Sequence, residues 1–188
     1  MRTIRFAVLL SVALPLSACL GLGGLGGGSN VMYVAHPAVD RPATVDPAAA
    51  VAMISEFRKK SGLGAVTVDP GLAAIATKHA RAMAADDKLS HVLPGEVSFA
   101  ARLSAGGYNA AYAAENVGAG YHDLAEAIAG WKASPPHRAN MLNRNVDRIG
   151  IAVAYNKDSR FKDFWCLVLA KPDERKMAAG PSGGPAAQ

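Results

Sequence analysis

The sequence predicts an α+β fold in which three to four helices surround a small, mainly antiparallel sheet. Apolar residues recur at helical spacing after two Asp-Pro pairs, at 46–47 and 69–70, and Asp followed by Pro is a common helix start. Two apolar segments near the C-terminus have the patterns of paired strands instead. With 51% hydrophobic and 19% charged residues among 188, the chain has the composition of a packed globular domain.

The first 18 residues are predicted to be a lipoprotein signal peptide and not part of the fold. Two arginines precede an apolar run at 6–16 that is too short to span a bilayer. The following Leu16-Ser17-Ala18-Cys19 resembles the bacterial lipobox, whose cysteine becomes lipidated; an ordinary secretory signal cleaved near Ala18 is the alternative. We therefore expect an exported protein anchored to a membrane through Cys19, facing the periplasm or the cell surface.

Flexible segments are predicted on both sides of the folded domain. Residues 19–46 contain the lipidated cysteine and a linker, in which positions 21–28 include six glycines. Residues 172–188 are rich in proline and glycine and poor in large apolar side chains, which is typical of a disordered tail. The folded domain is accordingly expected at 47–171.

Four helices are predicted from start signals, periodic apolar faces and stop signals, over residues 47–61, 70–90, 98–105 and 123–134. The second helix has one continuous apolar face, formed by Leu72, Ile75, Ala76, His79 and Met83. His79 on this face is interpreted as a hydrogen-bonded core histidine. Pro135 and Pro136 must end the fourth helix, and one or two further turns are expected at 136–142.

A hairpin of two strands is predicted next. Ile149, Ile151 and Val153 alternate with small residues, which is the period of a half-buried strand. Residues 164–170 form an almost continuous apolar run, which suits a central strand buried on both faces. Cys166 lies within this run and is expected to be an inert, buried thiol.

Three ionisable residues stand out by their positions as candidates for chemistry. His91 follows the second helix, Glu115 lies in a Gly/Ala-rich segment with few other charges, and His137 follows Ser134-Pro135-Pro136. The spacings between the three match no local metal-binding motif, so the sequence alone does not show that they meet.

An ordered set of motifs resembles the bacterial form of the CAP superfamily, also called the SCP or pathogenesis-related-1 domain. The matching stretches, over about 120 residues, are His91, Arg102-Leu103 with Gly107-Tyr108, Glu115-Asn116-Val117-Gly118, the run 131–142 and Ile149-Gly150-Ile151-Ala152. The resemblance implies an α-β-α sandwich with a central cavity lined by two histidines and two acidic residues. His91, Glu115 and His137 match three of these positions, and Ser134 stands where the family has the second acid.

Three functions are compatible with this set of residues. Two imidazoles and one carboxylate are sufficient ligands for zinc or another divalent cation, which would polarise a water in a metal-dependent hydrolase using His91, Glu115 and His137. Without a metal, the carboxylate raises the pKa values of the imidazoles and the cleft binds a cation or a polar head group. In a purely structural envelope domain, Glu115 accepts bonds from loop amides.

We favour a non-catalytic envelope module that presents its cleft, with His91, Glu115, Ser134 and His137, to a lipid, peptide or glycan. Ser134 has the features of a helix cap and not of an activated nucleophile. Nucleic acid is not expected as a partner, because the net charge of +5 is spread without any block of five basic residues. The protein is expected to be a monomer.

Overall fold

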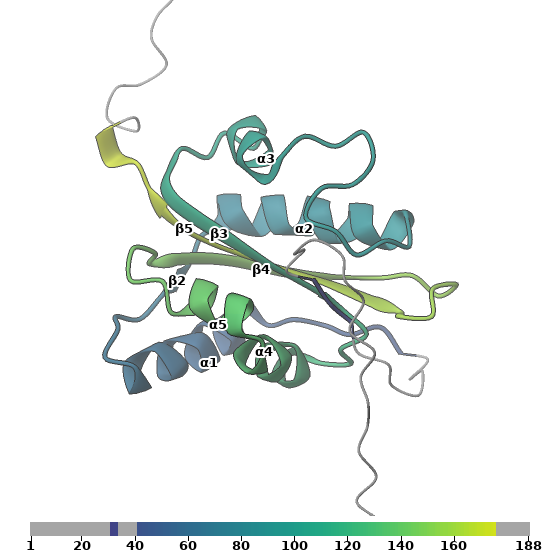
Figure 1. Cartoon of the computed structure of the whole chain (residues 1–188), viewed down its shortest axis with the longest axis horizontal. Helices are drawn as coiled ribbons and strands as arrows, with labels where there is room; N and C mark the ends of the chain where they lie inside the picture. Colours follow the sequence, from purple (N-terminus) through teal and green to yellow (C-terminus); the bar gives the residue numbers. More distant parts are fainter. Residues whose placement is uncertain (1–30, 34–40, 176–188) are drawn as a thin grey trace, which may run out of the picture.

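The computed structural model describes residues 31–33 and 41–175 of the chain. The predicted signal peptide, Cys19 and most of the predicted tail lie outside these residues. The described part is an α-β-α sandwich, as expected: a five-stranded sheet lies between two helical layers (Figure 1). None of its helices is long and apolar enough to cross a membrane.

The sheet has the strand order β1-β3-β5-β4-β2. Its strands are β1 (Val31–Tyr33), β2 (Thr67–Val68), β3 (Ala110–Ala119), β4 (Arg148–Tyr155) and β5 (Asp163–Pro172). The three long strands pair antiparallel, and the two short edge strands pair parallel to β3 and β4. The sheet is therefore mainly antiparallel, and the predicted hairpin corresponds to β4 and β5.

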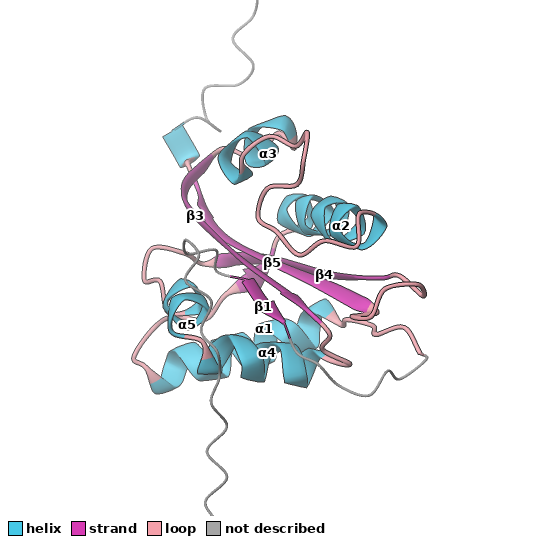
Figure 2. Cartoon of the chain, turned by 45° about the vertical axis from the view of Figure 1, so that its right-hand side comes forward, coloured by secondary structure: helices cyan, strands magenta, loops and turns pink. Residues whose placement is uncertain are grey.

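Five helices cover the sheet in the described residues, one more than the upper limit predicted. They are α1 (Pro47–Lys60), α2 (Pro70–Ala85), α3 (Phe99–Ala105), α4 (Leu124–Ala133) and α5 (Pro135–Met141). Helices α2 and α3 lie on one face of the sheet, and α1, α4 and α5 lie on the other (Figures 1 and 2). The turns expected after the double proline form α5 as a separate helix.

Strand β5 joins the two hydrophobic cores. Its side chains alternate between the α2 core, which contains Phe164 and Cys166, and the α1/α4 core, which contains Trp165 and Leu167. The prediction of a strand buried on both faces is confirmed. Helix α2 packs directly on β4. A Cβ atom at Gly150 of this strand would lie only 2.1 Å from the Leu72 carbonyl carbon, so the close approach requires glycine.

Three expectations about local structure were wrong. Helix α2 ends at Ala85 and not near residue 90, because Asp87 adopts a φ of 47°, which ends the helical path. The segment around Glu115, which the structural alternative placed in a loop, is the long strand β3. Part of the predicted linker is ordered in the sheet, since Val31–Tyr33 forms β1 and the Ala43 amide donates to the Asp163 carboxylate at 2.9 Å.

Candidate functional site

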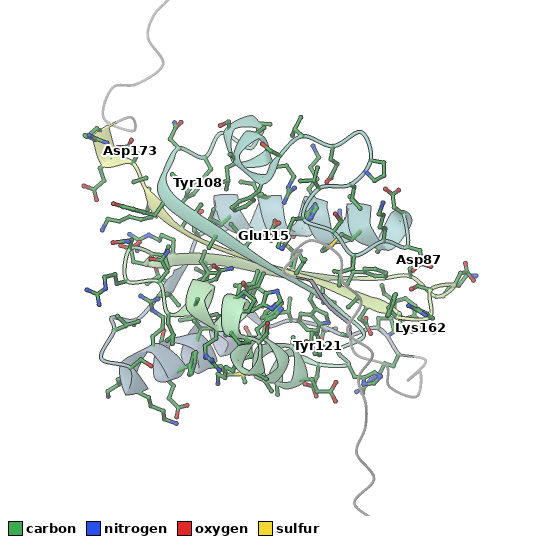
Figure 3. All side chains as sticks on the ribbon, viewed as in Figure 1. Asp87, Tyr108, Glu115, Tyr121, Lys162 and Asp173 are labelled. Carbon is green, nitrogen blue, oxygen red and sulfur yellow. The ribbon has the colours of Figure 1, made fainter. Side chains whose placement is uncertain are left out.

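Glu115 is placed by β3 on the face of the sheet that α2 and α3 cover. Val117 and Ala119, two and four residues further along the strand, belong to the α2 core, and alternate residues of a strand share a face. Glu115 is 5% exposed and lies near the centre of the molecule (Figure 3). A carboxylate at such a depth is stable only with charged or hydrogen-bonding partners.

Both oxygens of Glu115 have such partners. His91 Nδ1 donates to Oε1 at 2.8 Å, and Arg102 Nη2 donates to Oε2. Burial disfavours the ionised carboxyl, but the hydrogen bond from His91 and the charge of Arg102 outweigh it, so the pKa of Glu115 is below its ordinary value. The Cys166 thiol also donates to Oε2 at 3.6 Å, and burial together with the Glu115 charge raises the pKa of this thiol.

Arg102 on α3 is the partner that sequence reasoning missed. Its Nη1 donates to the His91 carbonyl, so one guanidinium holds both the backbone of His91 and the carboxylate of Glu115. The guanidinium carbon also lies 5.5 Å from the centre of the Phe99 ring. The available signal in the sequence was that Arg102 is the sole charged residue of the short helix Phe99–Ala105.

A second imidazole adjoins this group. His79 is fully buried on α2, and its Nε2 donates to the Ser90 carbonyl at 2.9 Å, which confirms the prediction of a hydrogen-bonded core histidine. Its Nδ1 lies 3.3 Å from Glu96 Oε2, and Glu96 also accepts from the Leu93 amide at 3.2 Å. These contacts fix the segment between α2 and α3. We call His79, His91, Glu96, Arg102 and Glu115 the ionic cluster.

The other predicted histidine lies among hydroxyl and amide groups. His137 Nδ1 lies 2.9 Å from Ser134 Oγ, and the Asn116 side chain donates to the His137 carbonyl at 3.1 Å. Asn140 donates to Asn116 Oδ1 at 2.9 Å and to the Glu115 carbonyl at 3.1 Å. We call Asn116, Ser134, His137 and Asn140 the amide cluster. Ser134 is the N-cap residue of α5, but its side chain makes no capping bond and contacts the imidazole instead.

The structure therefore brings the predicted residues together as two pairs, His91 with Glu115 and Ser134 with His137. The pairs are connected through β3, because Glu115 and Asn116 are adjacent and their side chains point to opposite faces. Within residues 31–33 and 41–175, no three His, Cys, Asp or Glu side chains are grouped so as to hold a metal ion. A carboxylate already bonded to Arg102 and His91 suits a charge-balanced cluster better than a cation site.

The sequence was compared with known families and proteins. Residues 51–169 match the CAP family, described as the "Cysteine-rich secretory protein family". The chain is 32% identical over 97 residues to "Uncharacterized membrane protein YlbC" of Bacillus subtilis, a match that covers 52% of this chain and 28% of that protein. The chain thus spans less than a third of this relative.

Solved structures share the fold. An extracellular protein containing a SCP domain from Bacillus anthracis aligns with a TM-score of 0.60 and 25% identity, over 66% of this chain and 39% of that one. An outer surface protein from Borrelia burgdorferi aligns with a TM-score of 0.61 and 21% identity, over 71% of this chain and 100% of that one. At 21% identity, the likeness to the Borrelia burgdorferi protein establishes the fold alone.

Proposed function

Because the chain belongs to the cysteine-rich secretory protein family, we propose that it is a lipid-anchored protein of the cell envelope whose CAP domain is a non-catalytic binding module. One observation carries this proposal: the buried carboxylate of Glu115 is neutralised by Arg102 and bonded to His91. The names of the relatives, which describe an extracellular protein, an outer surface protein and a membrane protein, support a place in the envelope.

The bonding of Glu115 argues against catalysis. A proton or a metal ion at this carboxylate would have to compete with the hydrogen bonds that its oxygens already accept. Both oxygens of Glu115 accept hydrogen bonds from within the domain. The lowered pKa also makes the carboxylate a weaker base. The cluster therefore suits a fixed recognition surface, at which the side chains of His91 and Glu96 are partly exposed.

Zinc titration separates this proposal from a metal-dependent hydrolase. The chain from residue 20 onward retains every described residue and lacks the cysteine that would carry lipid. We expect isothermal titration calorimetry to give the same weak zinc binding for this protein and for its His91→Ala/His137→Ala variant, with His122→Ala as a control for loss of another imidazole. Tight binding of one zinc by the parent protein, lost in the double variant, would support the hydrolase and refute the proposal.

The anchor and the ligand are tested on protein isolated from its own cells. Intact mass spectrometry should give a chain that begins at Cys19 and carries acyl groups; an unmodified chain beginning elsewhere would indicate an ordinary secretory signal.

Small molecules extracted from the same material should include a compound bound in a fixed ratio. If His91, Glu115 and His137 are all changed to alanine and only the melting temperature falls, with the bound compound retained, the cluster is purely structural.

A further inference from the structure

The outer edge of β3 is only partly covered in residues 31–33 and 41–175 (Figure 2). On its inner side β3 pairs with β5 from Ala110 to Ala119, whereas on its outer side β1 pairs with it only at 117–119. No other strand of the described residues lies beside 110–116. Because β1 and β2 are only three and two residues long, this stretch of β3 is the longest open edge of the described sheet.

The backbone of Ala113 faces outward at this edge. Ala113 lies opposite Ala170, whose carbonyl accepts from the Asp147 amide on the other side of β5 at 3.1 Å. Opposite residues of an antiparallel pair either bond to each other or both face away, so the N–H and C=O of Ala113 point away from β5. Glu115 has the same orientation, and its carbonyl accepts from the Asn140 side chain. The outward groups of Ala113 have no such partner among the described residues.

A cavity of about 320 Å³ adjoins the same edge on the α3 side of the sheet. We call it the α3 pocket; Phe99, Leu103 and Ser104 of α3 line it, together with Tyr108 and with Ala113 of β3. No charged side chain is part of its lining. Its volume is at the lower end of the range of small-molecule sites, which suits one large apolar side chain.

The opposite side of this edge is also apolar. Side chains alternate along a strand, so Tyr112 and Ala114 face the layer of α1, α4 and α5, whereas Ala113 faces α3. Tyr112 is 51% exposed. Residues 110–114 include neither a charge nor a proline, which are common means of preventing another strand from adding to an exposed edge.

We infer that an extended, uncharged peptide adds as a further strand beside Ala113, with one large apolar side chain in the α3 pocket and a neighbouring side chain against Tyr112. Such a strand would continue the line of β1, which already pairs with this edge. The register shift between Ala110 and Tyr112 limits pairing to a few residues. This length suits a peptide better than a second folded copy, whose stable interface would need about 1,200 Å².

This inference rests on the proposed function, because it names the ligand class and the place for the binding module. The hydrogen bonds to the backbone would supply affinity without regard to sequence, and the α3 pocket would select the side chain. An uncharged peptide is favoured because neither the pocket lining nor residues 110–114 carry a charge.

NMR titration of the isotope-labelled chain from residue 20 onward with acetyl-Thr-Val-Phe-Val-Thr amide tests the inference. A new hydrogen bond should move the Ala113 amide proton downfield, while that of Val68, at the opposite edge of the sheet, should stay in place. Two further peptides carry one N-methyl group each, on the phenylalanine or on the valine before it. Because alternate N–H groups of a strand face the same edge, only one of the two should lose affinity, by at least about tenfold.

Ala113→Pro removes the outward N–H and should weaken binding by at least about tenfold. The melting temperature should stay near that of the parent, because this N–H has no partner among the described residues. Val68→Pro is the matched control. The amides of Thr67 and Asp69 donate toward β4, so the Val68 N–H also faces outward, at an edge where the peptide is not expected.

The α3 pocket is tested with two neighbouring substitutions on α3. Ser104→Trp, at an exposed position in the lining, should fill the pocket and weaken binding by at least about tenfold. Ala105→Trp, at the next exposed position and outside this pocket, should leave the affinity unchanged.

No binding at about 1 mM peptide would overturn the inference, as would equal affinities of the two N-methylated peptides or of Ala113→Pro and Val68→Pro. Undiminished binding by a folded Ser104→Trp variant would overturn the use of the α3 pocket. Dimerisation of the parent in sedimentation velocity, abolished by Ala113→Pro, would identify a second copy as the occupant and overturn the peptide. These failures are distinct from failure of the proposed function. If native material carries a bound compound that the peptide does not displace, the binding module stands and this edge is not its site.

Discussion

The two helical layers each bury an arginine, and the two side chains are bonded in different ways. Arg58 on α1 is 2% exposed and directs all four of its hydrogen bonds to backbone carbonyls, those of Gly64, Met141, Asn143 and Val146. Arg102 on α3 is bonded to one carbonyl and one carboxylate, and its Nε has no acceptor in the described residues.

The comparison separates a structural charge from one suited to function. Arg58 connects α1 to the segment between α5 and β4, and every nitrogen of its guanidinium is used. Arg102 balances a buried carboxylate, lines a cavity and retains an unused donor. A buried guanidinium whose donors all bond to the backbone leaves no donor for a ligand. A guanidinium beside a cavity that keeps an unused donor leaves one available.

The largest effect is expected from Arg58→Met. Four buried or partly buried carbonyls would lose their donor, so the free energy of unfolding should fall by about 4 kcal/mol. Denaturant unfolding measures this loss. Because arginine stays charged between pH 4 and pH 7, the loss in the free energy of unfolding should be the same at both pH values.

Arg144→Met, at an exposed arginine, is the matched control and should change stability little. If Arg58→Met were as stable as this control, the carbonyl bonds of Arg58 would not be a structural connection and the comparison would fail.

A smaller, pH-dependent effect is expected from Glu115→Gln, which leaves the Arg102 charge without its carboxylate. The free energy of unfolding at pH 7 should fall by about 3 kcal/mol. Since the pKa of Glu115 is lowered in the folded protein, the stabilisation is complete above the ordinary carboxyl pKa of 4.5 and is lost as the pH falls through the folded value. The difference in the free energy of unfolding between the parent and Glu115→Gln should therefore become smaller as the pH falls below about 4.5.

Urea unfolding at a series of pH values tests this narrowing. Glu56→Gln removes a carboxylate from an exposed pair with Lys60 and should have little effect at any pH. A loss for Glu115→Gln that stays constant down to about pH 3 would mean that the carboxylate contributes by hydrogen bonding alone and not by charge.

The smallest effect is expected from Ser134→Ala in the amide cluster. Removal of the hydroxyl takes away the group that lies 2.9 Å from His137 Nδ1, at a cost of about 1 kcal/mol in the free energy of unfolding. Ser104→Ala, at an exposed serine on α3, is the control. A loss for Ser134→Ala no larger than that of this control would mean that the contact with His137 contributes little to stability.

The sequence predicted the elements whose signals are local. Asp46 and Asp69 cap α1 and α2 with their side chains, as their positions before proline indicated. The alternation at 149–153 and the apolar run at 164–170 correspond to β4 and β5. Such signals depend on neighbouring residues, so one sequence is sufficient to read them.

The missed features depend on distant partners. Strand β3 contains five alanines, which have little preference for strands, and its conformation comes from pairing with β5. Arg102 bonds groups 11 and 13 residues away, outside the reach of one helical face. The resemblance to a family identified His91, Glu115 and His137, but it did not show that the structure divides them between two clusters.

If the chain is anchored at Cys19, the pairing of β1 with β3 limits how far the domain can lie from the membrane. With an anchor at Cys19, the residues before Val31 span at most roughly 40 Å when fully extended, against roughly 95 Å for all residues before Pro47. A partner on the far side of a compartment wider than the reach of this segment and the domain together would not be contacted. In a protein anchored at Cys19, the short edge strand would therefore confine encounters to molecules close to the anchoring bilayer.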